Sequence, residues 1–329
     1  MNRPLFAALV VGLAVASATV RSDIHPPLQM PWSEGATDCK AGPSSPIDVH
    51  PADGAGTYIL RESLCSTFEA PFMYLLVGSS RAMLIDTGDV ADPGQMPLAQ
   101  KVMELLPDSG GAKLPLLVVH THRHLDHRAG DPQFIGQRGI EVVGYDIDSV
   151  RNYYRFGDHP DGIAQIDLGG RIVDAIATPG HNETEVSFYD RNTALFFSGD
   201  FLLPGRLLID DTAADIASAR RVADFVRDRP VAAVLGGHIE LNSARQTFDW
   251  GSQYHPDEHI LPLTKADLLR LPDALAKFNG FYSKADGFIM MNQMHNLIAM
   301  AVAAGVVVLA LIALLWRYVR RRRRRRAIA

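Results

Sequence analysis

The chain has 329 residues, of which 47% are hydrophobic, and its 32 basic and 37 acidic side chains give a formal net charge of −5. Eight of the basic residues are arginines at 317 and 320–326, and without them the balance is 24 against 37, or −13. Such an acidic chain argues against a polyanionic substrate such as RNA, because like charges repel. The length is sufficient for one sizeable hydrophobic core.

The first 18 residues have the features of a secretory signal peptide. One basic residue, Arg3, precedes an apolar run at 5–15, and the small-residue sequence Ala-Ser-Ala follows at 16–18. This order of basic, apolar and small residues is typical of a cleaved export signal, with an uncleaved anchor as the alternative. We therefore predict a signal peptide over 1–18.

Residues 19–57 hold six prolines and little periodicity, so we expect an extended N-terminal arm or linker. The chain has two cysteines, Cys39 in this arm and Cys65 just beyond it. In an oxidising compartment these cysteines can form one disulfide, with two free thiols as the alternative.

Strands and helices alternate through the middle of the chain. Two apolar runs, 72–77 and 81–85, flank the Gly-Ser-Ser sequence at 78–80 and predict a hairpin that ends at Asp86. This pattern favours an α/β domain with a mixed sheet covered by helices. The other predicted elements are a helix at 97–106, strands at 116–119, 142–145, 171–176 and 195–199, a helix at 147–154, an amphipathic helix at 213–226 and a strand at 231–235.

The sequence Thr-His-Arg-His-Leu-Asp-His at 121–127 directly follows the buried strand predicted at 116–119. Its four candidate ligands are His122, His124, Asp126 and His127. Imidazole nitrogen and carboxylate oxygen suit zinc best, with iron or manganese as alternatives. We treat His120, on the opposite face of the strand, as structural.

Three further candidates lie at the ends of apolar segments, each beside a glycine that permits a sharp turn: His181, Asp200 and His238. Asp86 ends another strand in the same way. Five strand ends that carry metal-ligating or acidic residues predict one shared site.

These motifs resemble the five ordered motifs of the metallo-β-lactamase superfamily. The resemblance implies a four-layer αββα sandwich, which we place at 58–285. It also implies one metal on His122, His124 and His181, and a second on Asp126, His127 and His238. Asp200 would bridge the two metals, and Asp86 would orient ligands without binding metal. An aspartate in this bridging position makes the chain similar to the glyoxalase II-like branch of the superfamily.

The resemblance implies a hydrolase that holds two zinc ions and cleaves an ester, thioester or lactone bond in a small-molecule substrate. Two divalent ions would lower the pKa of a shared water and polarise the substrate carbonyl. Asp126 would act in catalysis by passing a proton to the leaving group. Alternatives are a mononuclear iron oxidoreductase similar to the persulfide dioxygenases, a β-lactam hydrolase, and a domain that binds a ligand without catalysis.

Residues 297–316 form a run of twenty residues without a charge, which as a helix is about 30 Å long and matches a bilayer core. The basic tail at 317–329 is typical of a cytoplasmic stop-transfer segment. We therefore predict a transmembrane helix, a cytoplasmic tail and an extracytoplasmic catalytic domain, in the periplasm or outside the cell. The arginines would contact anionic lipid headgroups rather than nucleic acid. We predict no protein partner.

The sequence at 255–259 fits the H-x-x-E-H pattern of a zinc protease, but Pro256 opposes the continuous helix that this motif needs. Tyr254, His255 and His259 instead either line the substrate mouth of the metal site or are ordinary surface residues.

Overall fold

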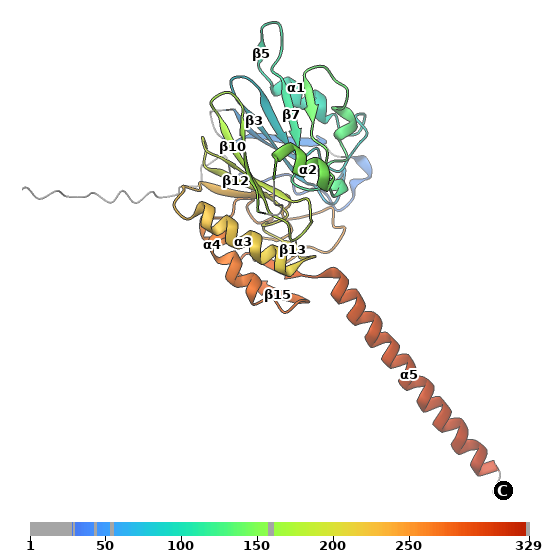
Figure 1. The fold of residues 1–329 in the computed structure, drawn as a ribbon. Coiled ribbons are helices and arrows are strands. Elements are labelled where there is room, and N and C mark those ends of the chain that lie inside the picture. Colours follow the sequence, from blue (N-terminus) through green and yellow to red (C-terminus); the bar gives the residue numbers. More distant parts are fainter. Residues whose placement is uncertain (1–27, 29, 43–44, 53–55, 157–160, 327–329) are drawn as a thin grey trace, which may run out of the picture.

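The computed structural model describes residues 28, 30–42, 45–52, 56–156 and 161–326, so the predicted signal peptide at 1–18 lies outside the described residues. Two sheets form the body of the domain (Figure 1). The six-stranded sheet has the order β1 (Ile47–Pro51), β2 (Thr57–Glu62), β3 (Phe72–Val77), β4 (Ala82–Ile85), β7 (Leu116–Val119), β8 (Ile140–Val142). The five-stranded sheet has the order β14 (Ala233–Gly236), β12 (Leu195–Gly199), β11 (Val186–Asp190), β10 (Ile172–Ala177), β9 (Ile163–Asp167).

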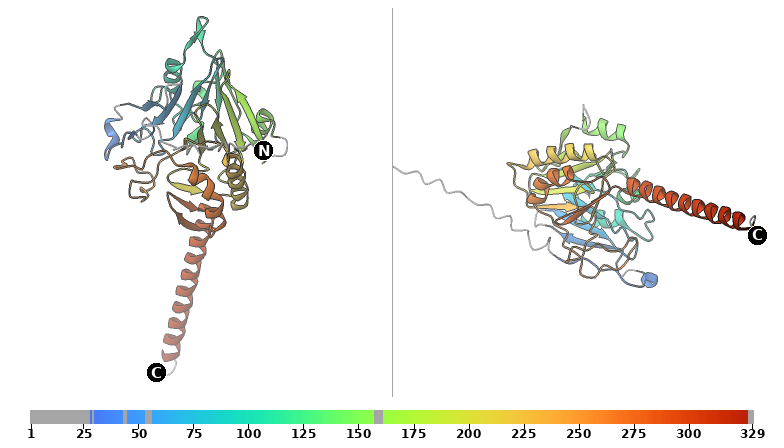
Figure 2. Two further views of the ribbon diagram at one scale, coloured as in Figure 1. Left: turned by 90° about the vertical axis from the view of Figure 1, so that its left-hand side faces the viewer. Right: turned by 90° about the horizontal axis from the view of Figure 1, so that it is seen from below.

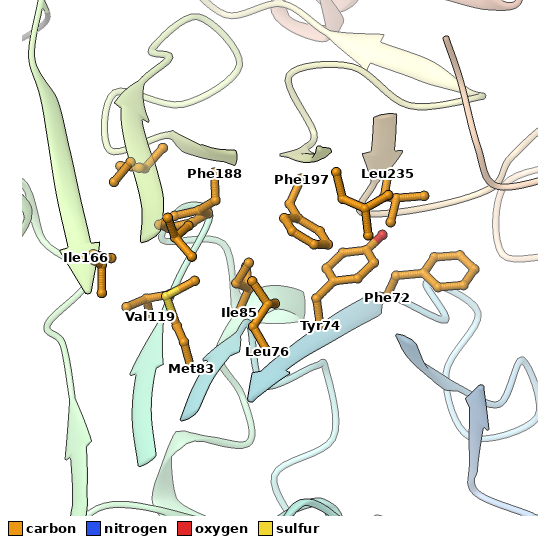
Figure 3. Close-up of a cluster of buried hydrophobic side chains, with 14 of the residues drawn as sticks. Phe72, Tyr74, Leu76, Met83, Ile85, Val119, Ile166, Phe188, Phe197 and Leu235 are labelled. Atoms are coloured by element: carbon orange, nitrogen blue, oxygen red, sulfur yellow. The ribbon is translucent and has the colours of Figure 1, made fainter. Parts of the chain in front are cut away.

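The main core lies between these two sheets. Phe72, Tyr74 and Leu76 alternate along β3 and point to the second sheet, from which Phe188 and Phe197 meet them (Figure 3). The residues of β3 that lie between these three face the outer side of the sheet, because successive side chains of a strand point to opposite faces. Each sheet therefore has an apolar inner face and an apolar outer face.

Helices cover both outer faces. The helix α1 (Leu98–Leu105) packs Leu98 and Val102 against the outer face of the six-stranded sheet. The helices α3 (Thr212–Val226) and α4 (Lys265–Ala276) pack against the outer face of the five-stranded sheet. The resulting layers are helix, sheet, sheet and helix, as the resemblance implied.

Most of the predicted elements form close to their expected bounds. The strands β3 and β7 and the helix α2 (Ile147–Tyr154) have the predicted bounds. One strand is displaced: the stretch predicted at 142–145 forms β8 at Ile140–Val142 instead. The backbone N–H of Val143 still donates to Val118, after which the chain turns into the loop that precedes α2.

The N-terminal arm is more than a linker. Its residues 47–51 form β1 at the edge of the six-stranded sheet, and Trp32 packs its ring against Phe72 in the main core. Pro51 is tolerated because an edge strand leaves one row of backbone groups unpaired. Cys39 and Cys65 form a disulfide that joins the arm to the loop after β2.

A small third sheet closes the base of the domain. It has the order β13 (Arg206–Leu208), β16 (Phe288–Met291), β15 (Tyr282–Ala285), and β16 leads into the helix α5 (Gln293–Arg326). The short hairpin of β5 (Asp108–Ser109) and β6 (Ala112–Lys113) lies at the opposite end of the domain from α5 (Figures 1 and 2). Residues Gln293–Arg321 of α5 are long and apolar enough to cross a bilayer, and they contain the predicted span at 297–316.

Candidate metal centre

The residues predicted to form one site converge at the end of the sandwich where β4, β7, β10, β12 and β14 finish. The loop after β7 includes a short 3-10 helix, Leu125–His127, which turns Asp126 and His127 back toward the strand ends. His181, Asp200 and His238 follow β10, β12 and β14. The sequence placed these candidate residues after their strands, and the strand order of the two sheets brings them together.

A first cluster consists of three imidazoles. The Nδ1 atom of His124 lies 2.9 Å from Nε2 of His122 and 3.0 Å from Nε2 of His181. All three ligand atoms lie within 4.8 Å of one another. These are the three residues predicted to hold one metal.

A second cluster consists of Asp126, His127, Asp200 and His238. The Nε2 atoms of His127 and His238 are 3.3 Å apart, and Oδ2 of Asp126 lies 3.3 Å from each of them. The tetrahedral coordination of zinc, with bonds of about 2.0 to 2.1 Å, places neighbouring ligand atoms about 3.3 Å apart. The spacing in both clusters fits such an ion.

Asp200 lies between the two clusters. Its Oδ1 atom is 3.6 Å from Nε2 of both His127 and His238, and its Oδ2 atom is 3.6 Å from Nε2 of His181. Oδ1 is buried and has no hydrogen-bond partner among the residues that the structure describes. A buried carboxylate oxygen without a donor is costly, and a bound cation would relieve that cost.

Three imidazoles use their outer nitrogens in hydrogen bonds. Nδ1 of His127 donates to Asp86 over 2.9 Å, Nδ1 of His181 donates to the carbonyl of Leu208 over 2.7 Å, and Nδ1 of His238 donates to the carbonyl of Glu69 over 2.8 Å. When the outer nitrogen carries the proton, the inner nitrogen presents a lone pair to the site. Asp86 thus has the position expected of a residue that orients ligands.

Gly237 leaves the space that the second cluster needs. A Cβ atom at this position would lie 2.4 Å from Oδ1 of Asp200 and 2.9 Å from Cε1 of His127. Any side chain would displace one of these candidate ligands, so the site itself requires the glycine before His238.

The electrostatics of the centre favour a bound cation. Burial and the neighbouring imidazoles hold the pKa of His122 well below its usual value, so this ring is neutral. Burial acts to raise the pKa of Asp126 and of Asp200, but the histidines outweigh it and hold both pKa values below the usual range. The neutral ring of His122 and the ionised carboxylates of Asp126 and Asp200 are in the protonation states that metal ligation needs.

His238 differs from His122. Burial acts to lower its pKa, but Asp200 and Asp126 outweigh burial and raise the pKa to about 10. A proton therefore competes with a metal ion for Nε2 of His238, which makes metal binding dependent on pH.

A pocket opens beside the second cluster. Its lining combines aromatic, acidic and basic side chains: Phe68, Glu69, Arg206, His238, Ile239, Glu240, Phe248, Asp249, Trp250, Gly251, Ser252 and His255. Most of these residues carry no sequence signal of a site. The same is true of the residues that orient two of the candidate ligands. Glu69 and Leu208 accept hydrogen bonds from His238 and His181 through backbone carbonyls, which any residue type can supply.

The structure brings only one of the three residues expected at the mouth into this pocket. His255 lines it, and its ring stacks on Phe248 with centroids 4.0 Å apart. Tyr254 and His259 do not line it, and residues 255–259 form a turn rather than the helix of a zinc protease. His120 hydrogen-bonds Asp131 over 2.8 Å, which agrees with its structural role.

Comparison with known proteins gives a consistent result. Residues 66–238, more than half of the chain, match the family model described as the metallo-beta-lactamase superfamily. The chain is 24% identical over 239 residues to an acyl-coenzyme A thioesterase of Gallus gallus, a match that covers 63% of this chain and 86% of that protein. It is 29% identical over 126 residues to a hydroxyacylglutathione hydrolase of Idiomarina loihiensis, covering 37% of this chain and 46% of that protein.

Solved structures of similar fold include a metallo-beta-lactamase from Pontibacter korlensis, with a TM-score of 0.46, 16% identity, and coverage of 69% of this chain and 99% of that chain. Another is a metallo-beta-lactamase from Hirschia baltica, with a TM-score of 0.43, 17% identity, and coverage of 59% and 91%.

Proposed function

Because the chain belongs to the metallo-beta-lactamase superfamily, we propose that it is a hydrolase with two zinc ions that cleaves an ester, thioester or lactone bond. The observation that carries this proposal is the position of Asp200. Its two carboxylate oxygens face opposite ligand clusters, each 3.6 Å from imidazole nitrogens. A carboxylate in this position suits a bridge between two cations.

The proposed ligand sets follow the two clusters. His122, His124 and His181 would hold one ion, Asp126, His127 and His238 the other, with Asp200 shared. Two such ions would supply an activated water and polarise the substrate carbonyl. The remaining tasks, which are to orient ligands, to form the pocket and to transfer a proton, belong to the chain itself.

Asp126 is the candidate for proton transfer. Its side chain is 22% exposed, against 13% for Asp200. In hydrolysis a water oxygen bonds to the carbonyl carbon, the bond to sulfur or oxygen breaks, and a proton must reach the leaving group. An ionised carboxylate at the edge of the site can take that proton and pass it on.

The bond class is supported by the relatives. The acyl-coenzyme A thioesterase and hydroxyacylglutathione hydrolase to which the chain is similar act, by their names, on acyl thioesters. We therefore place thioesters first, ahead of esters and lactones, and keep β-lactams as an alternative.

A mononuclear iron oxidoreductase is the second candidate. It needs a single site of histidine and carboxylate ligands. The second cluster, with Asp126, His127 and His238 in contact around one point, disfavours this reading because it offers a full second ligand set.

We propose that α5 anchors the protein in a membrane, with the catalytic domain on the extracytoplasmic side and the arginines at 320–326 in the cytoplasm. Support comes from the apolar composition of the helix, from its apolar stretch, none of which is buried, and from the position of its basic end. A protease applied to spheroplasts, in which the periplasmic face of the membrane is accessible, would cleave the catalytic domain if this topology is right, and would spare it if the domain is cytoplasmic.

The function is tested by metal analysis of the full chain in detergent, alongside Asp200→Ala and the control Asp148→Ala, which changes an exposed aspartate of α2. We expect about two zinc ions per parent chain, fewer in Asp200→Ala, and loss of thioester hydrolysis by a factor of about 100 or more in that variant alone. One iron per chain, with oxygen consumption in the presence of a persulfide, would instead establish the oxidoreductase.

A further inference from the structure

The strand β13 links the metal centre to the third sheet. The carbonyl of Leu208, the last residue of β13, accepts the hydrogen bond from His181 over 2.7 Å. Leu208 is paired with Met291, the last residue of the parallel strand β16. One pair of strands therefore connects a candidate ligand to the residue that stands two positions before α5.

The first turn of α5 is fixed to the same sheet. Asn292 joins β16 directly to α5, and its side-chain amide donates to Ile209 over 2.8 Å. Nδ1 of His295 donates to the backbone carbonyl of Gly280 over 2.8 Å, and the side-chain amide of Asn296 donates to the backbone carbonyl of Phe281 over 3.0 Å. Because these bonds come from the residue before α5 and from two positions in its first turn, the helix leaves the domain in a defined direction.

The metal centre lies at the end of the domain that faces this helix. The strand β7 follows the β5–β6 hairpin, which lies at the end farthest from α5, and runs toward the base, where the ligand-bearing loop begins (Figures 1 and 2). The uncharged run at 297–316 begins four residues into α5, or about 6 Å along the helix axis. The proposed bilayer surface is therefore close to the base of the site.

Two exposed aromatic residues lie beside the start of α5. Phe281 is 47% exposed and Tyr282 is 45% exposed, and Tyr282 pairs with Met291 across the hairpin of β15 and β16. Aromatic side chains are enriched at membrane interfaces, where the ring contacts lipid and the polar edge remains hydrated. Their position is suited to contact with lipid headgroups.

The pocket itself favours an apolar ligand over an anionic one. Its one arginine, Arg206, is already engaged: it pairs with Glu240 at 3.3 Å, donates to the carbonyl of Phe248 and stacks on Trp250 at 4.7 Å. Glu69 and Asp249 add acidic groups, while Phe68, Phe248 and Trp250 provide aromatic surface. Phosphate-bearing substrates would meet acidic side chains without a free arginine.

We infer that this hydrolase acts at the bilayer surface on an acyl ester or thioester whose hydrocarbon chain is dissolved in the outer leaflet. This inference rests on the proposed hydrolase function and membrane anchor. Water adds across the acyl bond at the metal centre and releases a fatty acid and an alcohol or thiol. The hydrogen bonds that fix the first turn of α5 would keep the site close to the bilayer surface, where the acyl bond of such a substrate lies.

The test inserts a flexible spacer of about 20 glycine and serine residues between Asn296 and Leu297, which spans about 25 Å on average. This position leaves the contacts of Asn292, His295 and Asn296 intact. The matched control carries the same spacer after Arg326. Each full-length protein is reconstituted in phosphatidylcholine vesicles and assayed with two thioesters of one head group, a soluble butanoyl and a bilayer-bound hexadecanoyl compound.

We expect the spacer at 296 to reduce hexadecanoyl turnover by about tenfold, because the site loses its high effective concentration at the interface. The spacer at 296 should not change butanoyl turnover, and the control spacer after Arg326 should change turnover of neither thioester. A second variant, Phe281→Ser with Tyr282→Ser, should also reduce hexadecanoyl turnover alone, whereas Ile163→Ser, an exposed change on β9, should not.

Equal hexadecanoyl turnover with and without the spacer would overturn the inference and leave the hydrolase function standing. If the parent protein hydrolyses neither thioester, nor a matched ester, the proposed function fails and the inference fails with it.

Discussion

Asp86 accepts a hydrogen bond from Nδ1 of His127 over 2.9 Å, at a residue whose backbone φ is +65°. The same carboxylate accepts from the backbone N–H of Thr121 over 2.7 Å and from its hydroxyl over 2.8 Å. It therefore joins the end of β4 to the start of the ligand-bearing loop. The unusual backbone conformation at Asp86 belongs to the turn that places the carboxylate there.

Asp86→Asn removes an acceptor from His127. The amide nitrogen of asparagine cannot accept the Nδ1 proton, so the imidazole loses its fixed tautomer and orientation. We expect metal affinity to fall by about 10- to 100-fold with the fold retained. Competition with a zinc chelator measures this change, and Asp148→Asn is the matched control. An unchanged affinity would show that Asp86 does not orient His127.

Gly237→Ala places a methyl group in the second cluster. Its Cβ would lie 2.4 Å from Oδ1 of Asp200, so the carboxylate or His127 must move. We expect loss of metal from the second cluster and of hydrolysis, with a stability cost of about 1 to 3 kcal/mol. Metal analysis and thermal unfolding test this expectation. In the control Gly94→Ala, the nearest atom is a side-chain oxygen at 3.2 Å, and metal content should not change.

The buried ion pair of Arg61 and Glu258 fixes the loop beside the pocket. Two bonds of 2.7 Å join the guanidinium to the carboxylate, and the side chains are only 2% and 8% exposed. Glu258→Ala leaves a buried, unpaired arginine, so we expect the free energy of unfolding to fall by about 3 to 5 kcal/mol.

The double change Arg61→Met with Glu258→Leu should cost less than Glu258→Ala, because it leaves no unpaired charge in the interior. Denaturant unfolding of the parent, Arg61→Met, Glu258→Leu and the double variant measures the coupling. Additive losses would show that the pair contributes nothing beyond its separate contacts.

Asp215 links stability to pH. This carboxyl is buried under Gly180, and burial raises its pKa from 3.8 to about 8, with the nearby charge of Asp211 acting in the same direction. The folded state binds a proton that the unfolded state has lost between these two values. The stabilisation from that proton is complete below pH 4 and is lost as the pH rises to about 8, by up to about 1.4 kcal/mol per pH unit.

Asp215→Asn removes this titration. We therefore expect the variant to gain stability relative to the parent as the pH rises from 5 to 8. Thermal unfolding at several pH values measures the difference. A difference between the proteins that does not change with pH would show that Asp215 does not titrate in this range. Asp148→Asn, at an exposed position, should show no such trend.

The candidate ligand residues and the local elements around them could be predicted from the sequence. His122, His124, Asp126 and His127 follow a strand of four buried residues, and the strands and helix at 72–77, 116–119 and 147–154 form with the expected bounds. Alternation and helical periodicity are local patterns, and they report burial directly. The displaced strand β8 is short and half-exposed, so its pattern was weak.

How the candidate ligands are held, and where the site lies, depend on the tertiary structure. The carbonyl groups of Glu69 and Leu208 orient His238 and His181, and a backbone carbonyl leaves no trace in residue type. The pairing of β13 with β16, which brings the metal centre to the base of α5, joins segments about 80 residues apart. Such contacts depend on which strands meet across the fold, and that choice is made by the packing of the whole core.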